Sequence, residues 1–153
     1  MDREFRHIVR VLDIDLEGTK GVAYALTSIK GISLRFAYAI LKTVGINPEE
    51  RLGFLSESDV EKIETIARNP KKYGLPDWLL NRRKDLEEGE DFHLIGSDLD
   101  LKIKADIERM KRIRSWGGYR HTYGLTVRGQ KTRTTGRMGK SVGVRKRGVI
   151  SRG

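Results

Sequence analysis

The C-terminal part of the chain contains no acidic residue, and this feature limits what that part can fold into. Residues 109–153 carry 14 Lys and Arg side chains, whereas Glu108 is the last acid. Self-repulsion opposes compaction of such a block, which also holds 9 of the 17 glycines. We therefore expect an extended tail that becomes ordered against a polyanion, and nucleic acid is the natural counter-surface. The plain alternative is a soluble basic tail or a localisation signal.

The rest of the chain is close to neutral, and its composition narrows the class of protein. Residues 1–108 carry 17 basic and 21 acidic side chains. The absence of Cys excludes disulfides, thiolate nucleophiles and Cys-based zinc sites. No run approaches the ~20 apolar residues of a membrane span, and no apolar leader core follows Met1. We expect a cytoplasmic protein with no membrane partner.

Apolar spacing predicts a mainly α-helical fold. An extended segment or short strand is expected over residues 5–16, where Ile, Val and Leu are frequent. Three helices then follow: residues 19–30, residues 33–44 with Ser33 as N-cap and Gly45 after the end, and a helix from Ser56 or Ser58 to Asn69. Ser58 and Glu61 have the spacing of a capping box in the third helix.

Each predicted helix has an apolar stripe that we expect to lie in the core. The three stripes are Val22, Ala25, Leu26 and Ile29; Leu34, Ala37, Tyr38 and Leu41; and Val60, Ile63, Ile66 and Ala67. Three short helices can enclose only a small hydrophobic core. We therefore expect the folded domain, of the helix–hairpin–helix type, to be limited to residues 1–69.

The remaining residues divide into three predicted segments. Residues 70–97 form an irregular insertion, residues 98–116 a further long helix, and residues 117–153 an extended basic tail. The apolar stripe expected for the long helix is Leu99, Ile103, Ile107, Met110 and Ile113. Its acids come early and its cations late, which complements the helix dipole. The pair Gly117-Gly118 is expected to end this helix.

The first candidate site is the junction between the first two helices. Gly31 allows close approach of a ligand to the backbone, and the following helix start offers free N–H groups beside the charge of Lys30. This pattern fits a turn that binds phosphate by shape. A plain tight turn between two packed helices fits it equally well, and the spacing alone does not separate the two.

The second candidate site is a run of cations interleaved with hydroxyls, an amide and glycines. Arg can clamp phosphate or stack on a base, and Gln and Thr can reach phosphate, ribose or base edges. Trp116, Tyr119 and Tyr123 offer stacking faces nearby. The alternative is a disordered linker. The residues predicted to bind nucleic acid here, to which the family resemblance described below assigns RNA contact, are Arg120, His121, Arg128, Gly129, Gln130, Lys131, Thr132, Arg133, Thr134 and Arg137.

A catalytic or metal site is not expected. The three histidines, His7, His93 and His121, stand in different surroundings without the spacing of metal ligands. The chain has no phosphate-binding Walker loop, no nucleophile elbow and no dinucleotide fingerprint. We therefore expect no enzymatic activity, no cofactor and no small-molecule substrate.

The C-terminal motifs resemble a known family. Gly118-Tyr119-Arg120-His121 followed by Arg128-Gly129-Gln130-Lys131-Thr132-Arg133-Thr134 is similar to the signature of the universal small-subunit ribosomal protein family numbered thirteen in bacteria and archaea and eighteen in eukaryotes. The junction at residues 29–33 resembles the helix–two-turns–helix region of that family. Thr126 stands where the bacterial signature usually has Pro, and residues 70–99 resemble the longer archaeal and eukaryotic segment, so an archaeal-type member is favoured.

The resemblance implies a role and a set of partners. The protein would be a structural constituent of the head of the small ribosomal subunit, bound to small-subunit rRNA and beside the small-subunit protein numbered nineteen. Its globular part would help to form an intersubunit bridge with large-subunit RNA and protein, and its tail would run toward peptidyl-tRNA. The tRNA-proximal cations would be Lys140, Arg145, Lys146 and Arg147. A DNA-binding protein of the helix–hairpin–helix type is the alternative.

Overall fold

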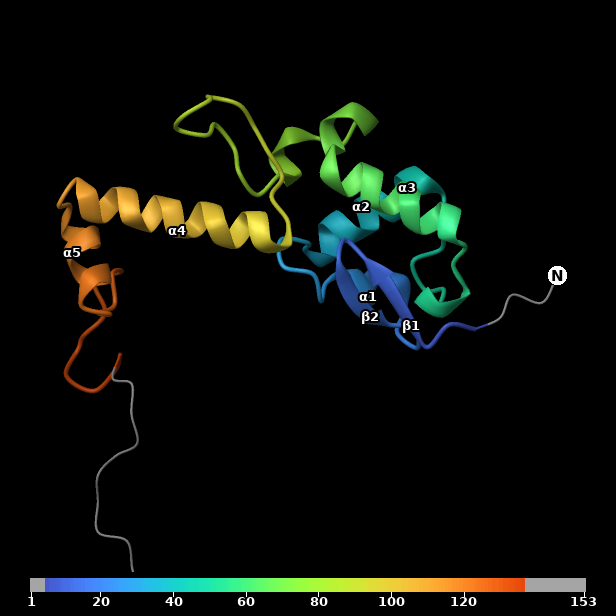
Figure 1. Ribbon diagram of the computed structural model, residues 1–153, viewed down its shortest axis with the longest axis horizontal. Coiled ribbons are helices and arrows are strands. Elements are labelled where there is room, and N and C mark those ends of the chain that lie inside the picture. The colour runs from blue at the N-terminus through green and yellow to red at the C-terminus, as the bar shows by residue number, and fades with distance from the viewer. Residues whose placement is uncertain (1–4, 137–153) are drawn as a thin grey trace, which may run out of the picture. The chain divides into compact units, whose positions relative to one another are not determined.

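The computed structural model describes residues 5–136 and shows a mainly helical chain with one small antiparallel sheet. It separates into two compact units, Met1–Ile103 and Lys104–Gly153. The first unit holds the sheet and helices α1 to α3, which cluster around a common core (Figure 1). Helix α4 crosses from the first unit into the second, and helix α5 lies in the second. The proposed cations from Arg137 onward lie outside the described residues.

The N-terminal segment is a β-hairpin. Strand β1 (Ile8–Val11) pairs antiparallel with β2 (Ile14–Glu17), and Val9 lies opposite Leu16. Leu12 and Asp13 make the turn with φ values of 50° and 63°. The sequence predicted one extended segment here and missed the reversal, because neither turn residue is the Gly or Asn that usually adopts this conformation.

Helix α1 (Val22–Leu26) is shorter than predicted. The carbonyls of Gly18 and Lys20 are not available for helical hydrogen bonds, because Gly53 N donates to Gly18 O at 3.0 Å and Leu52 N donates to Lys20 O at 3.0 Å. Beyond Leu26 the chain continues as tight turns. The four predicted apolar positions of this segment are nevertheless buried.

Helices α2 (Leu34–Val44) and α3 (Glu57–Arg68) agree with the predicted bounds. The Ser33 Oγ accepts a hydrogen bond from Phe36 N at 3.3 Å, and Gly45 ends α2 with a φ of +84°. Ser56, rather than Ser58, caps α3, since its Oγ accepts from Asp59 N at 3.2 Å. The predicted core stripe of α3 is confirmed.

The buried face of α2 is rotated relative to the prediction. Phe36 and Ile40 are fully buried with Ala37 and Leu41, whereas Leu34 and Tyr38 are exposed. Helix α2 packs against both α1 and α3, so it needs a broad apolar face. Burial of a side chain such as Phe36 stabilises the fold by about 1.5–3 kcal/mol.

The packed unit continues past residue 69. Short 3-10 helices η1 (Leu52–Phe54), η2 (Pro70–Tyr73) and η3 (Asp77–Leu79) lie in its loops. Leu75 and Leu80 are buried, and His93 stacks on Phe36 with ring centroids 3.7 Å apart. The insertion therefore contributes apolar side chains to the packed unit.

A buried carboxylate fixes the insertion. Asp85 is only 4% exposed and accepts from Arg82 Nε at 2.7 Å and from Lys102 Nζ at 3.3 Å. The Arg82 hydrogen bond holds the pKa of Asp85 at about 2, so the group is ionised at neutral pH. Lys102 belongs to α4, so this contact ties the insertion to the first part of that helix.

The last two helices depart from the sequence prediction. All residues of α4 (Gly96–Arg112) are described, and none is buried, so the apolar stripe predicted for this helix does not lie in a core. Helix α5 (Trp116–Thr122) contains Gly117 and Gly118, the pair that was predicted to begin an extended tail. The chain between the helices turns at Arg114, which has a φ of 56°.

Candidate nucleic-acid interface

The turn at Lys30 and Gly31 is packed against its own chain. Gly31 has a φ of +96°, and a Cβ placed on it would lie 2.4 Å from the Leu94 carbonyl oxygen. Gly96 N donates to Lys30 O at 2.8 Å, and Lys30 Nζ lies 2.6 Å from Asp100 Oδ2. Gly31 therefore allows the backbone of this turn to pack closely against the backbone at Leu94. The Lys30 charge already has a carboxylate partner.

His93 lies beside this turn. Its Nδ1 accepts from Asn81 N at 3.4 Å, which leaves the proton of the neutral ring on Nε2. Burial lowers the pKa of His93 to about 4. The ring is therefore neutral at pH 7 and acts as a packing group.

Contacts with the Met110 carbonyl oxygen fix helix α5 to the end of α4. Ser115 caps α5 by accepting from Gly118 N at 3.1 Å, and its hydroxyl donates to Met110 O at 3.0 Å. The Gly118 backbone packs so closely that a Cβ would lie 2.1 Å from that same Met110 oxygen. Only glycine allows this approach, which explains why Gly118 occurs inside a helix.

The segment after α5 is a folded loop. Arg120 Nε donates to the Thr126 carbonyl oxygen, and Leu125 N donates back to Arg120 O at 3.0 Å. Arg128 N donates to Gln130 Oε1 at 2.9 Å beside Gly129, which has a φ of +75°. Arg120 and Gln130 thus shape the loop through intramolecular bonds.

The structure places nine of the predicted residues in this helix and loop of the second unit. Arg120 and His121 are half-buried on α5, whereas the side chains of the loop residues face solvent. The exposed residues are Arg128, Gly129, Gln130, Lys131, Thr132, Arg133 and Thr134. The site therefore combines exposed cations with hydroxyls on a backbone held by its own hydrogen bonds. Arg137, Lys140, Arg145, Lys146 and Arg147 are not among the described residues.

The three aromatic residues that the sequence analysis named as stacking faces form a stripe on α5. Trp116 and Tyr119 stack with ring centroids 5.9 Å apart, and Tyr119 and Tyr123 follow at 4.8 Å. The Arg120 guanidinium carbon lies 5.7 Å from the Trp116 ring centroid. The helical spacing of these four positions would have revealed the stripe had the helix been expected.

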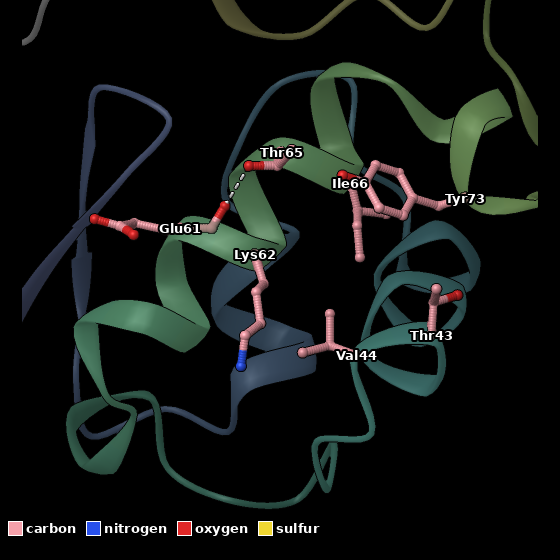
Figure 2. Close-up of a pocket in the computed structure, with 7 residues that line it drawn as sticks. All are labelled: Thr43, Val44, Glu61, Lys62, Thr65, Ile66 and Tyr73. Atoms are coloured by element: carbon pink, nitrogen blue, oxygen red, sulfur yellow. Dashed lines mark hydrogen bonds between the residues drawn. The ribbon is translucent and has the colours of Figure 1, made fainter.

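The first unit also has a groove on its surface. A groove of about 480 Å³ lies between α2 and α3 (Figure 2), but its Thr43 and Thr65 hydroxyls donate to carbonyls of their own helices. Both hydroxyls are therefore used within their own helices. Within residues 5–136, no cluster of metal-ligating side chains occurs, and no helix is long and apolar enough to cross a membrane.

An acid-free helix and loop with exposed cations is typical of basic proteins that act by binding rather than by catalysis. Comparison with known proteins places the chain within this class. The family described as ribosomal protein S13/S18 matches residues 10–138, so the chain belongs to this family of small-subunit ribosomal proteins. Members are structural proteins of the ribosome and not enzymes, which agrees with the sequence analysis.

Archaeal relatives match almost the whole chain. "Small ribosomal subunit protein uS13" of Hyperthermus butylicus is 52% identical over 145 residues, covering 95% of this chain and 96% of the relative. The protein of the same name from Thermofilum pendens is 53% identical over 146 residues, with 95% and 93% covered. That of Methanothermobacter thermautotrophicus is 46% identical over 147 residues, with 96% and 99% covered. The expected archaeal-type resemblance is confirmed.

Proposed function

We propose that this constituent of the small ribosomal subunit binds small-subunit rRNA through α5 and the loop that follows it. The observation that carries the proposal is the cluster of exposed cations and hydroxyls between Arg128 and Thr134, on a chain that has no acid after Glu108. Cations that replace condensed counterions on phosphates supply much of the free energy of such binding. Hydroxyl and amide groups add contacts to phosphate and ribose.

The loop geometry supports recognition by shape as well as by charge. Arg120 and Gln130 bond to the backbone inside the loop, so they hold Arg128 and its neighbours in a defined arrangement. A pre-organised loop loses less conformational entropy when it binds. We therefore assign Arg128, Lys131 and Arg133 to phosphate contacts, and Arg120 mainly to positioning the loop.

The Lys30–Gly31 turn has a secondary role in this proposal. Lys30 Nζ is shared with Asp100, and Gly31 is used for packing against Leu94. A contact of this turn with RNA would be made by the exposed side of the Lys30 ammonium group. The DNA-binding alternative loses support, because it rested on this turn as the main phosphate site.

The finer assignments concern the place in the subunit. We propose a position in the head, beside the small-subunit protein numbered nineteen. The packed unit would help to form a bridge with large-subunit RNA and protein. The cations of the C-terminal residues would lie near peptidyl-tRNA. These assignments rest on the family resemblance, and a density map of the intact ribosome would test them together.

The rRNA proposal is tested by paired substitutions in the full chain. Arg128→Ala with Arg133→Ala should weaken binding to a head-domain rRNA fragment by roughly tenfold to a hundredfold, since each lost phosphate contact removes about 1 kcal/mol or more. The matched control is Arg10→Ala with Arg51→Ala, which removes two exposed arginines of the first unit. Equal losses in the two variants would show that the loop contributes only bulk charge and would contradict the proposal.

A further inference from the structure

The aromatic stripe of α5 is an unusual surface for a soluble chain. Trp116 is 71% exposed, Tyr119 53% and Tyr123 63%, although each ring carries a large apolar area. These positions and Arg120 are spaced by three, four and seven residues, so they share one face of the helix. Contiguous exposed apolar side chains of this kind mark interaction sites.

The rings are ordered before any partner binds. Trp116 and Tyr119 are nearly parallel, with planes 13° apart, and Tyr119 contacts Tyr123. The helix beneath them is fixed by the Ser115 cap and by the close packing of Gly118 on Met110. A partner therefore meets a row of aromatic rings whose arrangement is already set, which lowers the entropy lost on binding.

The surrounding charge identifies the chemistry of the partner. Arg120 lies against Trp116, and the stretch just before the stripe supplies further cations without an acid. These cations are Arg109, Lys111, Arg112 and Arg114. A cationic edge with flat π faces fits an anionic polymer that also presents flat rings. Unpaired nucleotides of RNA meet both requirements, whereas base-paired nucleotides keep their faces within the duplex.

We propose that the Trp116, Tyr119 and Tyr123 stripe is a stacking platform for unpaired nucleobases of RNA. This inference rests on the proposed rRNA-binding function and deepens it: the loop at residues 128–134 holds phosphates, and α5 takes bases from a single-stranded or bulged segment. Arg120 serves both parts, since it donates to the Thr126 carbonyl and lies against Trp116.

The test compares two hairpin RNAs with the same number of phosphates. One has an adenosine loop, and the other has abasic riboses in the same loop. The full chain should bind the adenosine hairpin more tightly, because each stacked base contributes roughly a tenfold gain in affinity. Trp116→Leu with Tyr119→Leu should remove most of that difference, while Trp116→Phe should keep most of it. Circular dichroism checks that each variant keeps its helices.

A second readout follows the ring itself. The chain has two tryptophans, so Trp78→Phe leaves Trp116 as the only one. Its fluorescence should be quenched by the adenosine hairpin and much less by the abasic hairpin. Equal affinities for the two hairpins, together with equal quenching, would overturn the proposal. So would loss of binding to a ribosomal protein, without loss of RNA binding, in the leucine variant.

The proposed function and this inference fail in different ways. Arg128→Ala with Arg133→Ala should weaken binding to both hairpins by the same factor, because both contain the same phosphates. If that variant binds both hairpins normally, the phosphate assignment is wrong even when the adenosine preference persists. If the adenosine preference is missing while the arginine variant binds weakly, only the stacking platform is wrong.

Discussion

Two separate constraints require glycine at position 31. Its φ of +96° lies in a region that other residues adopt only with strain, and a Cβ would lie 2.4 Å from the Leu94 carbonyl oxygen. Gly31→Ala must therefore displace the Leu94–Ile95 backbone from the turn. We expect a loss of about 3 kcal/mol or more in the free energy of unfolding, measured by urea denaturation of the full chain.

Gly45 provides the matched control for this substitution. Its φ of +84° is similar, but among the described residues no heavy atom lies within 4 Å of a Cβ built there. Gly45→Ala should cost only the conformational strain, about 1–2 kcal/mol. Equal losses at positions 31 and 45 would show that the contact with Leu94 adds nothing to stability.

His93 should make stability depend on pH. Its pKa is lowered from 6.5 to about 4 in the folded state, so the unfolded chain binds more protons between these values. The free energy of unfolding should therefore fall as pH drops from about 6.5 toward 4. Because the ring is only partly shielded from solvent, we expect a loss on the order of 1–2 kcal/mol. Urea denaturation across this pH range measures it.

The control for His93 separates its titration from that of the acids. His93→Phe keeps a ring against Phe36 but cannot bind a proton, so the loss of stability over this window should become smaller. An identical pH profile for His93→Phe and the unaltered chain would mean that the buried ring is not responsible.

At the scale of elements, Gly118 fixes the direction of α5. A Cβ at this position would lie 2.1 Å from the Met110 carbonyl oxygen, whereas at Gly117 the nearest atom is Met110 Sδ at 3.9 Å. Gly118→Ala should detach α5 from the end of α4 and raise hydrogen exchange at its amides by at least tenfold, the equivalent of about 1.4 kcal/mol.

Gly117→Ala tests the same helix without the clash. Alanine favours a helix over glycine by about 0.5–1 kcal/mol, so this variant should leave exchange unchanged or slow it. The two substitutions differ by one position and have opposite expected signs. If both accelerate exchange alike, the helix tolerates no methyl group on either glycine, and the specific contact with Met110 is not what holds it.

Elements whose boundaries are set locally could be predicted from the sequence. Ser33 precedes α2 and Gly45 follows it. Both ends could be predicted, because capping needs only a hydroxyl directly before the first turn and a left-handed glycine directly after the last turn. The hairpin turn at Leu12 and Asp13 lacks such a signal, and α1 lost its first turn to pairing with residues 50–53. These features depend on contacts distant in sequence, which local patterns do not contain.

The candidate site was predictable in composition but not in shape. The run from Arg128 to Thr134 was identified from its residues alone, and whether it contacts RNA stays a prediction. Helix α5 was missed because a glycine pair normally ends a helix, and here Gly118 permits close packing on Met110 instead. The buried face of α2 was misplaced because apolar residues surround most of that helix.

At the scale of the whole molecule, the charge asymmetry predicts how binding responds to salt. If about half of the 14 cations after Glu108 meet phosphates, the logarithm of the association constant should fall with the logarithm of salt concentration with a slope of roughly −5 to −6. The measurement is a titration of the full chain with a head-domain rRNA fragment at several salt concentrations. A slope near zero would exclude phosphate neutralisation as the mechanism.

Shortening the chain after Gly136 separates the loop from the residues that follow it. This change removes six of the 14 cations, from Arg137 to Arg152. If the contacts are spread evenly, the slope should fall in magnitude to roughly −3, since each lost phosphate contact removes about 0.7–0.9. Arg10→Ala with Arg51→Ala removes cations of the first unit and should leave the slope unchanged. A shortened chain that keeps the full slope would mean that α4, α5 and the loop make all the phosphate contacts, contrary to an even spread.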